Sequence, residues 1–124
     1  MINNSALQGV HKKAITFFLQ KLESSKKDLP ITVIDLLQQI NSSTVSIENS
    51  LYYCIIKFYH NGENYDKYDK ILGIQVLHDD APPTSFNMYL KNNLLCEFEY
   101  FNADSSEICE QKMFGEKVLI EVIP

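Results

Sequence analysis

Arginine is absent from this chain of 124 residues, and all 11 of its basic residues are lysines. Proteins that bind phosphate or DNA normally use the arginine guanidinium, because its paired donors match the geometry of phosphate and of guanine. The lysine doublets Lys12-Lys13 and Lys26-Lys27 fit the solvated face of a helix. We therefore expect no nucleic-acid partner.

The sequence also lacks the spacings that phosphate loops and metal sites need. Its four glycines, Gly9, Gly62, Gly73 and Gly115, are scattered, so there is no glycine-rich loop to hold a phosphate. It has no Cys-x-x-Cys or His-x-x-x-His pair, so a zinc site would need residues gathered from distant segments. We expect no metal, no cofactor and no catalytic residues.

Cysteine is sparse and odd in number, with Cys54, Cys96 and Cys109. The amino terminus lacks the order of charged, apolar and cleavage segments of a signal peptide, so a reducing cytoplasm fits best. The cysteines lie in apolar surroundings, where they usually act as small buried hydrophobic residues. The apolar cluster 15–19 is too short to span a bilayer, and we expect no membrane association.

Length and composition indicate one globular domain covering residues 1–124. The chain is 45% hydrophobic and 22% charged, which is ordinary for a folded domain and far from the composition of disordered chains. The length is close to the commonest size of a single domain.

Two helices are predicted at the amino-terminal end. Ser5-Ala6-Leu7-Gln8 has the pattern of a capping box, and an apolar stripe follows it to about Ser24. Thr32-Val33-Ile34-Asp35 repeats the pattern in weaker form and predicts a second helix through Gln39 or Ile40. The two helices are expected to pack as a helical hairpin.

Strands are predicted from residue 44 onward. Segment 44–47 is the first, and segments 51–59 and 71–78 are rich in β-branched and aromatic residues. The last two are apolar on both faces, which predicts positions in the middle of a sheet. Segments 86–90 and 94–101 flank Asn92-Asn93, a pair that tolerates the positive φ of a hairpin turn.

The carboxy-terminal part is predicted as a short helix and a final strand. Asp104-Ser105-Ser106-Glu107 is a possible helix cap, with the helix ending before Gly115. Segment 118–123 is apolar except at Glu121, which predicts a strand buried on both faces. The expected fold is α+β, with an N-terminal helical hairpin packed on a mainly antiparallel sheet of four to six strands.

His78-Asp79-Asp80 is the segment most similar to a catalytic or metal site, because imidazole titrates near neutrality and a carboxylate can orient it. Pro82-Pro83 follows directly, and this composition is typical of a turn. We favour the turn. If segments 51–59 and 71–78 pair antiparallel, His60 and His78 lie at opposite ends of that hairpin, and His11 is expected to face solvent.

The strand Cys96-Glu97-Phe98-Glu99-Tyr100 is a candidate binding surface. Strand alternation sends Glu97 and Glu99 to one face and the other three residues to the opposite face. Two carboxylates about 7 Å apart repel each other unless they are solvated or meet a cation. If the last strand pairs nearby, Glu121 joins them; the alternative is a plain solvent-facing surface.

The loop from His60 to Asp69 is the second candidate, because it is too polar for the core and contains two tyrosines among its acids. Exposed tyrosine is favoured at interfaces for its large, stiff, amphipathic surface. The alternative is that the tyrosines pack back on the sheet edge. Its acid spacing does not match a calcium-binding EF-hand. The candidate partner-binding residues of this loop are Glu63, Tyr65, Asp66, Tyr68 and Asp69.

The net charge of −5 and the missing motifs favour a non-catalytic, acidic protein-binding module with a basic protein partner. Its most concrete form is a small neutralising partner of a cationic enzyme such as a nuclease toxin, of the bacterial immunity protein or antitoxin type. The alternatives are a small acidic chaperone or adaptor, or an enzyme or small-ligand carrier with an unrecognised site between helices and sheet. The sequence leaves monomer and homodimer open.

Overall fold

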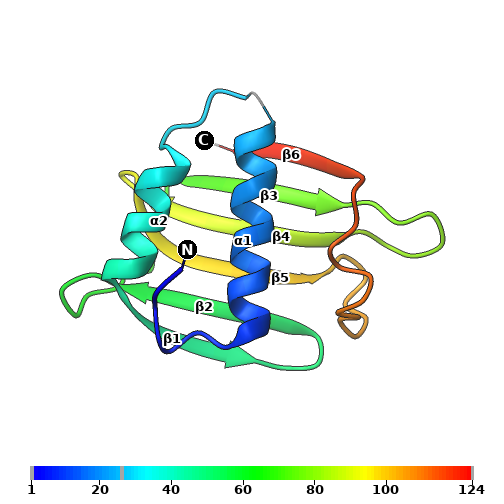
Figure 1. The fold of residues 1–124 in the computed structure, drawn as a ribbon, viewed down its shortest axis with the longest axis horizontal. Coiled ribbons are helices and arrows are strands. Elements are labelled where there is room, and N and C mark those ends of the chain that lie inside the picture. The colour runs from blue at the N-terminus through cyan, green and yellow to red at the C-terminus, as the bar shows by residue number, and fades with distance from the viewer. Residues whose placement is uncertain (1, 26, 124) are drawn as a thin grey trace.

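Two helices pack on one face of a six-stranded antiparallel sheet in the computed structural model, which describes residues 2–25 and 27–123 (Figure 1). This confirms the expected α+β fold with N-terminal helices. The elements are α1 (Gly9–Ser24), α2 (Val33–Ser42), β1 (Thr44–Asn49), β2 (Tyr53–Tyr59), β3 (Lys70–Val76), β4 (Thr84–Lys91), β5 (Leu94–Asn102) and β6 (Val118–Ile123).

Helix α1 begins later than the sequence predicts. Ser5–Leu7 form a turn, and Gln8 is the N-cap residue. The Gln8 side chain accepts from the backbone N–H of His11, and the His11 ring accepts from the backbone N–H of Gln8. The capping box therefore exists one turn further along, with histidine in the place that glutamate or glutamine usually takes.

Helix α2 begins as predicted and ends slightly later. The Thr32 hydroxyl accepts from the backbone N–H of Asp35 at 3.1 Å, which confirms Thr32 as the N-cap. Near the other end, the Gln39 side chain accepts from the Leu95 N–H at 2.6 Å and donates to the Asn93 carbonyl at 2.9 Å. These bonds tie α2 to the start of β5. The helix ends at Ser42, and the N–H of the C-cap residue Ser43 donates to the Gln39 carbonyl.

The strand order is β1-β2-β5-β4-β3-β6. β2 and β3 are both interior strands, as their apolar sequences predict, but they do not pair with each other. The antiparallel pairing of segments 51–59 and 71–78, the condition under which His60 and His78 were placed, is therefore not formed. The connection 60–69 instead crosses the β4–β5 hairpin, where the Asp69 N–H donates to the Leu90 carbonyl and Asp69 Oδ2 accepts from the Asn92 N–H.

The β4–β5 hairpin is formed as predicted. Asn92 and Asn93 have φ values of 50° and 63°, the left-handed conformation that a two-residue hairpin turn requires. Leu90 pairs with Leu95 beside this turn, with a register shift between Tyr89 and Leu90. Asparagine adopts this conformation at low cost, so the turn fixes the register of both strands.

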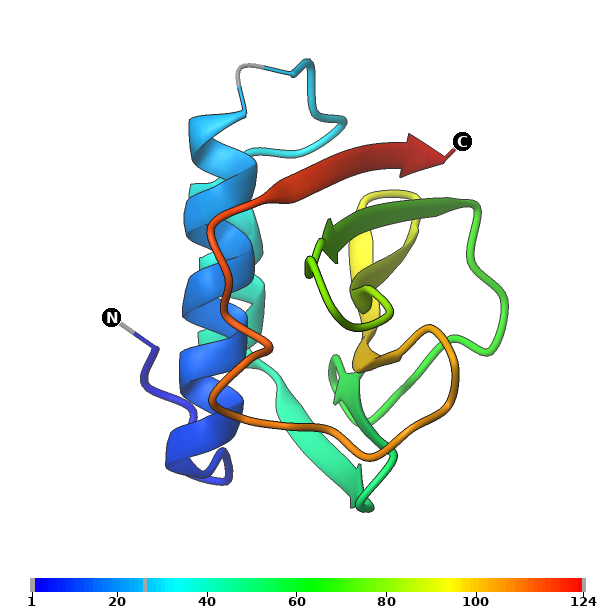
Figure 2. The ribbon, with the colours of Figure 1, turned by 90° about the vertical axis from the view of Figure 1, so that its right-hand side faces the viewer.

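The helix predicted after Asp104 is absent, because segment 103–117 forms a series of turns. Ser105 has a φ of 63°, and Asp104 Oδ1 accepts from the Ser106 N–H, which closes a local turn in place of a helix. Figure 2 shows the segment, in orange, crossing the end of the sheet on its way to β6. Met113 is buried there, and the Phe114 ring lies 5.2 Å from that of Phe17.

Strand β6 forms as predicted but lies at the sheet edge, paired only with β3. The expectation of burial on both faces is therefore wrong, since Leu119 and Ile123 are exposed. The free edge is partly covered by Lys27, whose ammonium donates to the Ile120 carbonyl. A lysine at an edge strand disfavours pairing with another chain.

The core fills the space between α1 and the sheet, which curves around the helix (Figure 2). Phe18, Phe58, Phe86 and Phe98 are fully buried there. The Phe18 ring contacts that of Phe98 edge to face, with 5.4 Å between centroids. Aromatic side chains thus fill the interior between α1 and the sheet.

Candidate functional site

The sheet face that points away from the helices, here called the outer face, carries the predicted acidic residues. Along β5, Cys96, Phe98 and Tyr100 are buried toward the helices, while Glu97 and Glu99 are half-buried on the outer face. The alternation predicted for this strand is confirmed.

Strand pairing places Glu121 in line with Glu99. Glu121 on β6 pairs with Gly73 on β3, Gly73 with Asn87 on β4, and Asn87 with Glu99 on β5. These positions form one row across the outer face, and Glu97 lies two residues from Glu99 on the same strand. We call Glu97, Glu99 and Glu121 the acidic patch.

Glu99 is oriented by two donors from β4. The Tyr89 hydroxyl donates to Glu99 Oε1, and the Asn87 side-chain amide donates to the same oxygen at 3.4 Å. Within the described part of the chain, the other carboxylate oxygen has no hydrogen-bond partner. Glu99 is therefore held in place with one oxygen free for an external donor.

Gly73 provides the space in which Asn87 makes this contact. A Cβ atom on Gly73 would lie 2.9 Å from Asn87 Oδ1, inside the closest separation that such atoms normally reach. Because Gly73 has no side chain, the Asn87 amide can lie across the row between Glu121 and Glu99.

The negative charge of Glu97 is only weakly balanced by nearby positive charge. Burial raises the pKa of its carboxyl group, and the neighbouring charge of Glu99 raises it further, whereas Lys57 opposes both effects from the paired position on β2. Over residues 2–25 and 27–123, the single ion pair within 4.0 Å joins Lys117 to Asp79 at 3.6 Å, in another region. A cation placed at the acidic patch would therefore relieve an existing electrostatic cost.

The loop contributes one residue to this surface. The Tyr68 ring lies 4.4 Å from the Tyr89 ring, centroid to centroid, and remains 49% exposed. Tyr68 therefore packs on the sheet and still presents an aromatic surface beside Glu97 and Glu99, the residues that adjoin Tyr89. Packing on the sheet thus holds for this residue, and its role in partner binding stays a prediction.

The other predicted loop residues have different positions. Asp69 accepts from the Asn92 N–H, so it supports the hairpin turn. Glu63 forms a two-residue bridge with His60 through backbone hydrogen bonds, and its side chain is exposed. Tyr65 and Asp66 are exposed on the loop, and among the described residues neither side chain hydrogen-bonds to the acidic patch.

Tyr89 and Asn87 belong to the site but were not predicted. Both lie at outward positions of β4, alternating with Phe86, Met88 and Leu90, which are buried. The alternation was visible in the sequence. What was missing was the strand register, which brings these residues opposite Glu97 and Glu99.

His78 lies in the β3–β4 connection, and a hydrogen-bond relay orients it. Its Nε2 is 3.0 Å from Thr84 Oγ1, the Thr84 hydroxyl donates to Asn102 Oδ1 at 2.8 Å, and the Asn102 amide donates to the Glu107 carbonyl at 2.8 Å. The Glu107 carbonyl can only accept, so the Asn102 amide nitrogen faces it and Asn102 Oδ1 faces Thr84. The Thr84 hydroxyl gives its proton to Asn102 Oδ1 and must therefore accept from His78, so Nε2 carries a proton. The relay holds the loop against segment 103–117.

His78 and Cys109 line a cavity of about 180 Å³. The Cys109 thiol donates to Gln111 Oε1 at 3.3 Å, so its proton is not directed at the imidazole. Cys109 lies in the irregular segment after β5, where the sequence predicted a helix. His60 and His78 follow strands that run in opposite directions and lie at opposite ends of the sheet (Figure 1).

The other two cysteines are enclosed by apolar side chains. Burial raises the pKa of both the Cys54 and Cys96 thiols, and a hydrogen bond with Tyr100 partly offsets this for Cys54. A thiol with a raised pKa is a weak nucleophile at neutral pH. Their positions fit the expected role as small buried hydrophobic residues.

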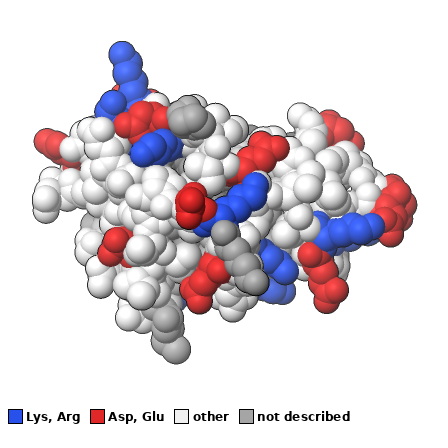
Figure 3. Space-filling view, turned by 90° about the horizontal axis from the view of Figure 1, so that it is seen from above, with Lys and Arg blue, Asp and Glu red and all other residues white. Residues whose placement is uncertain are grey.

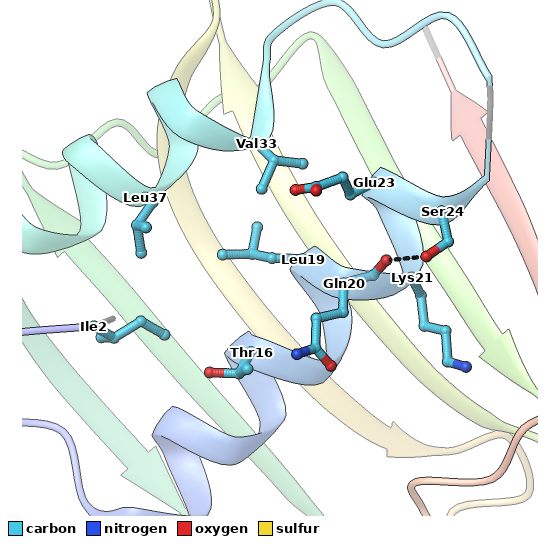
Figure 4. Close-up of a pocket in the computed structure, with 9 residues that line it drawn as sticks. All are labelled: Ile2, Thr16, Leu19, Gln20, Lys21, Glu23, Ser24, Val33 and Leu37. Carbon is cyan, nitrogen blue, oxygen red and sulfur yellow. Dashed lines mark hydrogen bonds between the residues drawn. The ribbon is translucent and has the colours of Figure 1, made fainter.

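A groove of about 480 Å³ runs between α1 and α2 on the side away from the sheet (Figure 4). Its apolar lining comes from Ile2, Leu19, Val33 and Leu37, and Glu23 lies on its rim. The remaining lining residues are polar or charged: Thr16, Gln20, Lys21 and Ser24, besides Glu23.

Acidic side chains are not concentrated on every surface of the protein. Seen from above the view of Figure 1, lysine and acidic side chains lie side by side (Figure 3). No group of three or more metal-ligating side chains is found in residues 2–25 and 27–123. Neither helix in the described chain has the length and apolar character needed to cross a membrane.

Comparisons with protein-family models, with curated proteins and with solved structures gave no match for this chain.

Proposed function

We propose that this protein is a non-catalytic, acidic binding module that uses its outer face to bind a basic protein. The observation that carries this proposal is the acidic patch: three carboxylates from β5 and β6 lie on the sheet face opposite the two helices, and no cation of residues 2–25 or 27–123 forms an ion pair with Glu97. Tyr68 and Tyr89 add aromatic surface beside it. Carboxylates next to tyrosines are well suited to lysine and arginine side chains.

The concrete form we propose is a small neutralising partner, of the immunity protein or antitoxin type. Enzymes that act on nucleic acids carry cationic clefts, and an acidic protein is steered toward such a cleft and can occupy it. The oriented carboxylate of Glu99 favours this role, because a preorganised acceptor loses little entropy on binding.

A chaperone or adaptor is the second candidate, supported by apolar surface near the β1–β2 turn. Leu51 is 66% exposed and Tyr52 is 49% exposed. Tyr52, Tyr53 and Phe101 line a hollow of about 400 Å³. Such a surface suits an apolar segment of an incompletely folded client.

The proposal is tested by affinity capture from lysate of the source cell with three immobilised proteins. These are the wild type, the charge-reversed variant E97K/E99K, and a control, E23K/D28K. The control reverses two exposed carboxylates on the helical side and changes the net charge equally. We expect the wild type and the control to retain one basic protein stoichiometrically, and E97K/E99K to lose it.

Binding kinetics with the captured partner then locate the interface. We expect E97K/E99K to reduce the association rate at low salt by about tenfold or more, since steering depends on the charge at the contact. Equal association rates for all three proteins would remove the acidic patch from the interface. Retention of many unfolded clients by all three would favour the chaperone.

A further inference from the structure

His11 is a buried histidine with an incomplete set of hydrogen bonds. It is 3% exposed, contrary to the expectation that it faces solvent. The helix stripe explains the difference, because His11 precedes Ile15 and Phe18 by one and two turns on the face of α1 that packs on the core. Its Nδ1 accepts from the Gln8 N–H at 3.2 Å, while its Nε2 is buried and has no partner in the described structure.

The proton positions on this ring follow from its bonds. Nδ1 accepts a hydrogen bond, so the neutral ring carries its proton on Nε2. A second proton can add only at Nδ1, and there it would face the Gln8 N–H and break the capping bond. The resulting imidazolium would also lie in the first turn of α1, where the helix dipole disfavours positive charge.

Residues 2–8, here called the N-terminal segment, are held at one end by this cap. Further along, the Asn4 side-chain amide donates to the carbonyls of Ile40 and Ser43 at 3.2 and 3.0 Å, at the end of α2. Ile2 is 7% exposed and lines the groove between the helices (Figure 4). The segment therefore connects the start of α1 to the end of α2.

We propose that His11 is an acid-sensitive latch: protonation at Nδ1 breaks the reciprocal cap with Gln8 and frees residues 5–8, the part of the N-terminal segment between the Asn4 bonds and α1. Burial lowers the pKa of His11 and is the only cause of that shift. Among the described residues no carboxylate or ammonium group adds to it, and the adjacent Lys12 and Lys13 are more exposed than the ring. The latch is independent of the acidic patch.

The test follows the His11 ring and the backbone amides of the N-terminal segment by NMR in the full chain between pH 8 and pH 4. We expect the ring to titrate below about 6.5, the ordinary histidine value. Over the same range, the amides of Leu7 and Gln8 should lose about tenfold in protection against hydrogen exchange, after correction for intrinsic rates. Stable protection while the ring titrates would overturn the proposal.

The matched variant is His11→Gln, because glutamine at this position can accept from the Gln8 N–H and does not titrate. We expect H11Q to keep the amide protection of the wild type at pH 7 and to lose the acid response. The control H60Q should retain the acid response. An unchanged acid response in H11Q would overturn the latch, and if H11Q does not fold, the wild-type titration decides on its own.

Discussion

The Tyr89 hydroxyl on β4 donates a hydrogen bond to the carboxylate of Glu99 on β5, diagonally across the outer face. Burial raises the pKa of the Tyr89 hydroxyl, and the bond to Glu99 raises it further. The phenol therefore keeps its proton and remains a donor throughout the physiological range. This pair gives the acidic patch one carboxylate of defined orientation.

Removing this donor should cost stability in a way that depends on Glu99. We expect Tyr89→Phe to lower the free energy of unfolding by about 1 kcal/mol, the net value of a typical hydrogen bond. In a double-mutant cycle with Glu99→Ala, which removes the acceptor, the two effects measured by urea unfolding should not add. Additive effects would show that the contact contributes nothing to stability.

The ionised carboxylate of Glu97, in contrast, should lower the stability of the folded protein. Its pKa is raised in the folded state, so the native protein binds more protons through that window, and the contribution of Glu97 to stability rises as pH falls. At pH 7 the ionised carboxylate is therefore a cost. We expect Glu97→Gln to stabilise the protein by roughly 0.5–1 kcal/mol at pH 7 and by less near pH 4.

The control for this measurement is Glu63→Gln, which removes a carboxylate from the exposed loop. It should change stability by less than about 0.5 kcal/mol at either pH. A destabilised Glu97→Gln protein at pH 7 would contradict the argument that Glu97 is held at a cost.

Gly73→Ala tests the row across the outer face. The new Cβ would approach Asn87 Oδ1 to 2.9 Å, so the amide must move, and we expect its contact with Glu99 to be lost. The Asn87 side-chain amide resonance should shift, with a change in unfolding free energy below about 1 kcal/mol, because alanine also lowers the entropy of the unfolded chain. Unchanged Asn87 resonances would show that the row tolerates a side chain at this position.

The hairpin turn offers a test of backbone conformation. Asn92 has a φ of 50°, which a β-branched residue adopts only with strain. We expect Asn92→Val to lower the urea midpoint, at a cost of about 1–2 kcal/mol, and Asn92→Gly to stay close to the wild type. Both variants keep the backbone N–H that donates to Asp69, so an equal loss in both would point to the asparagine side chain instead.

Local chemistry made part of this structure predictable. Thr32 caps α2 and Asn92-Asn93 turns the hairpin because each effect depends on a few neighbouring residues. Alternation likewise placed Glu97 and Glu99 on one face. These predictions needed no knowledge of which strands pair.

The features that the sequence did not predict depend on contacts between residues that are distant in the chain or that meet only on a helix face. β2 pairs with β5 and not with β3, a choice made by long-range register that strand composition does not encode. In the β4–β5 hairpin, the register shift between Tyr89 and Leu90 pairs Tyr89 with Glu97 and so brings it to the acidic patch. His11 was misjudged because its neighbours in sequence are lysines, whereas its neighbours on the helix face are core residues.

The pairing of β2 with β5 has a consequence for how the chain folds. β1 with β2, and β3 with β4 and β5, each join strands that are close in sequence, but Tyr53 and Phe101 at the β2–β5 seam come from distant parts of the chain. Closing that seam requires a long loop to lose entropy before new contacts compensate. We expect the meander and the first hairpin to form early and the seam between them to set the folding rate.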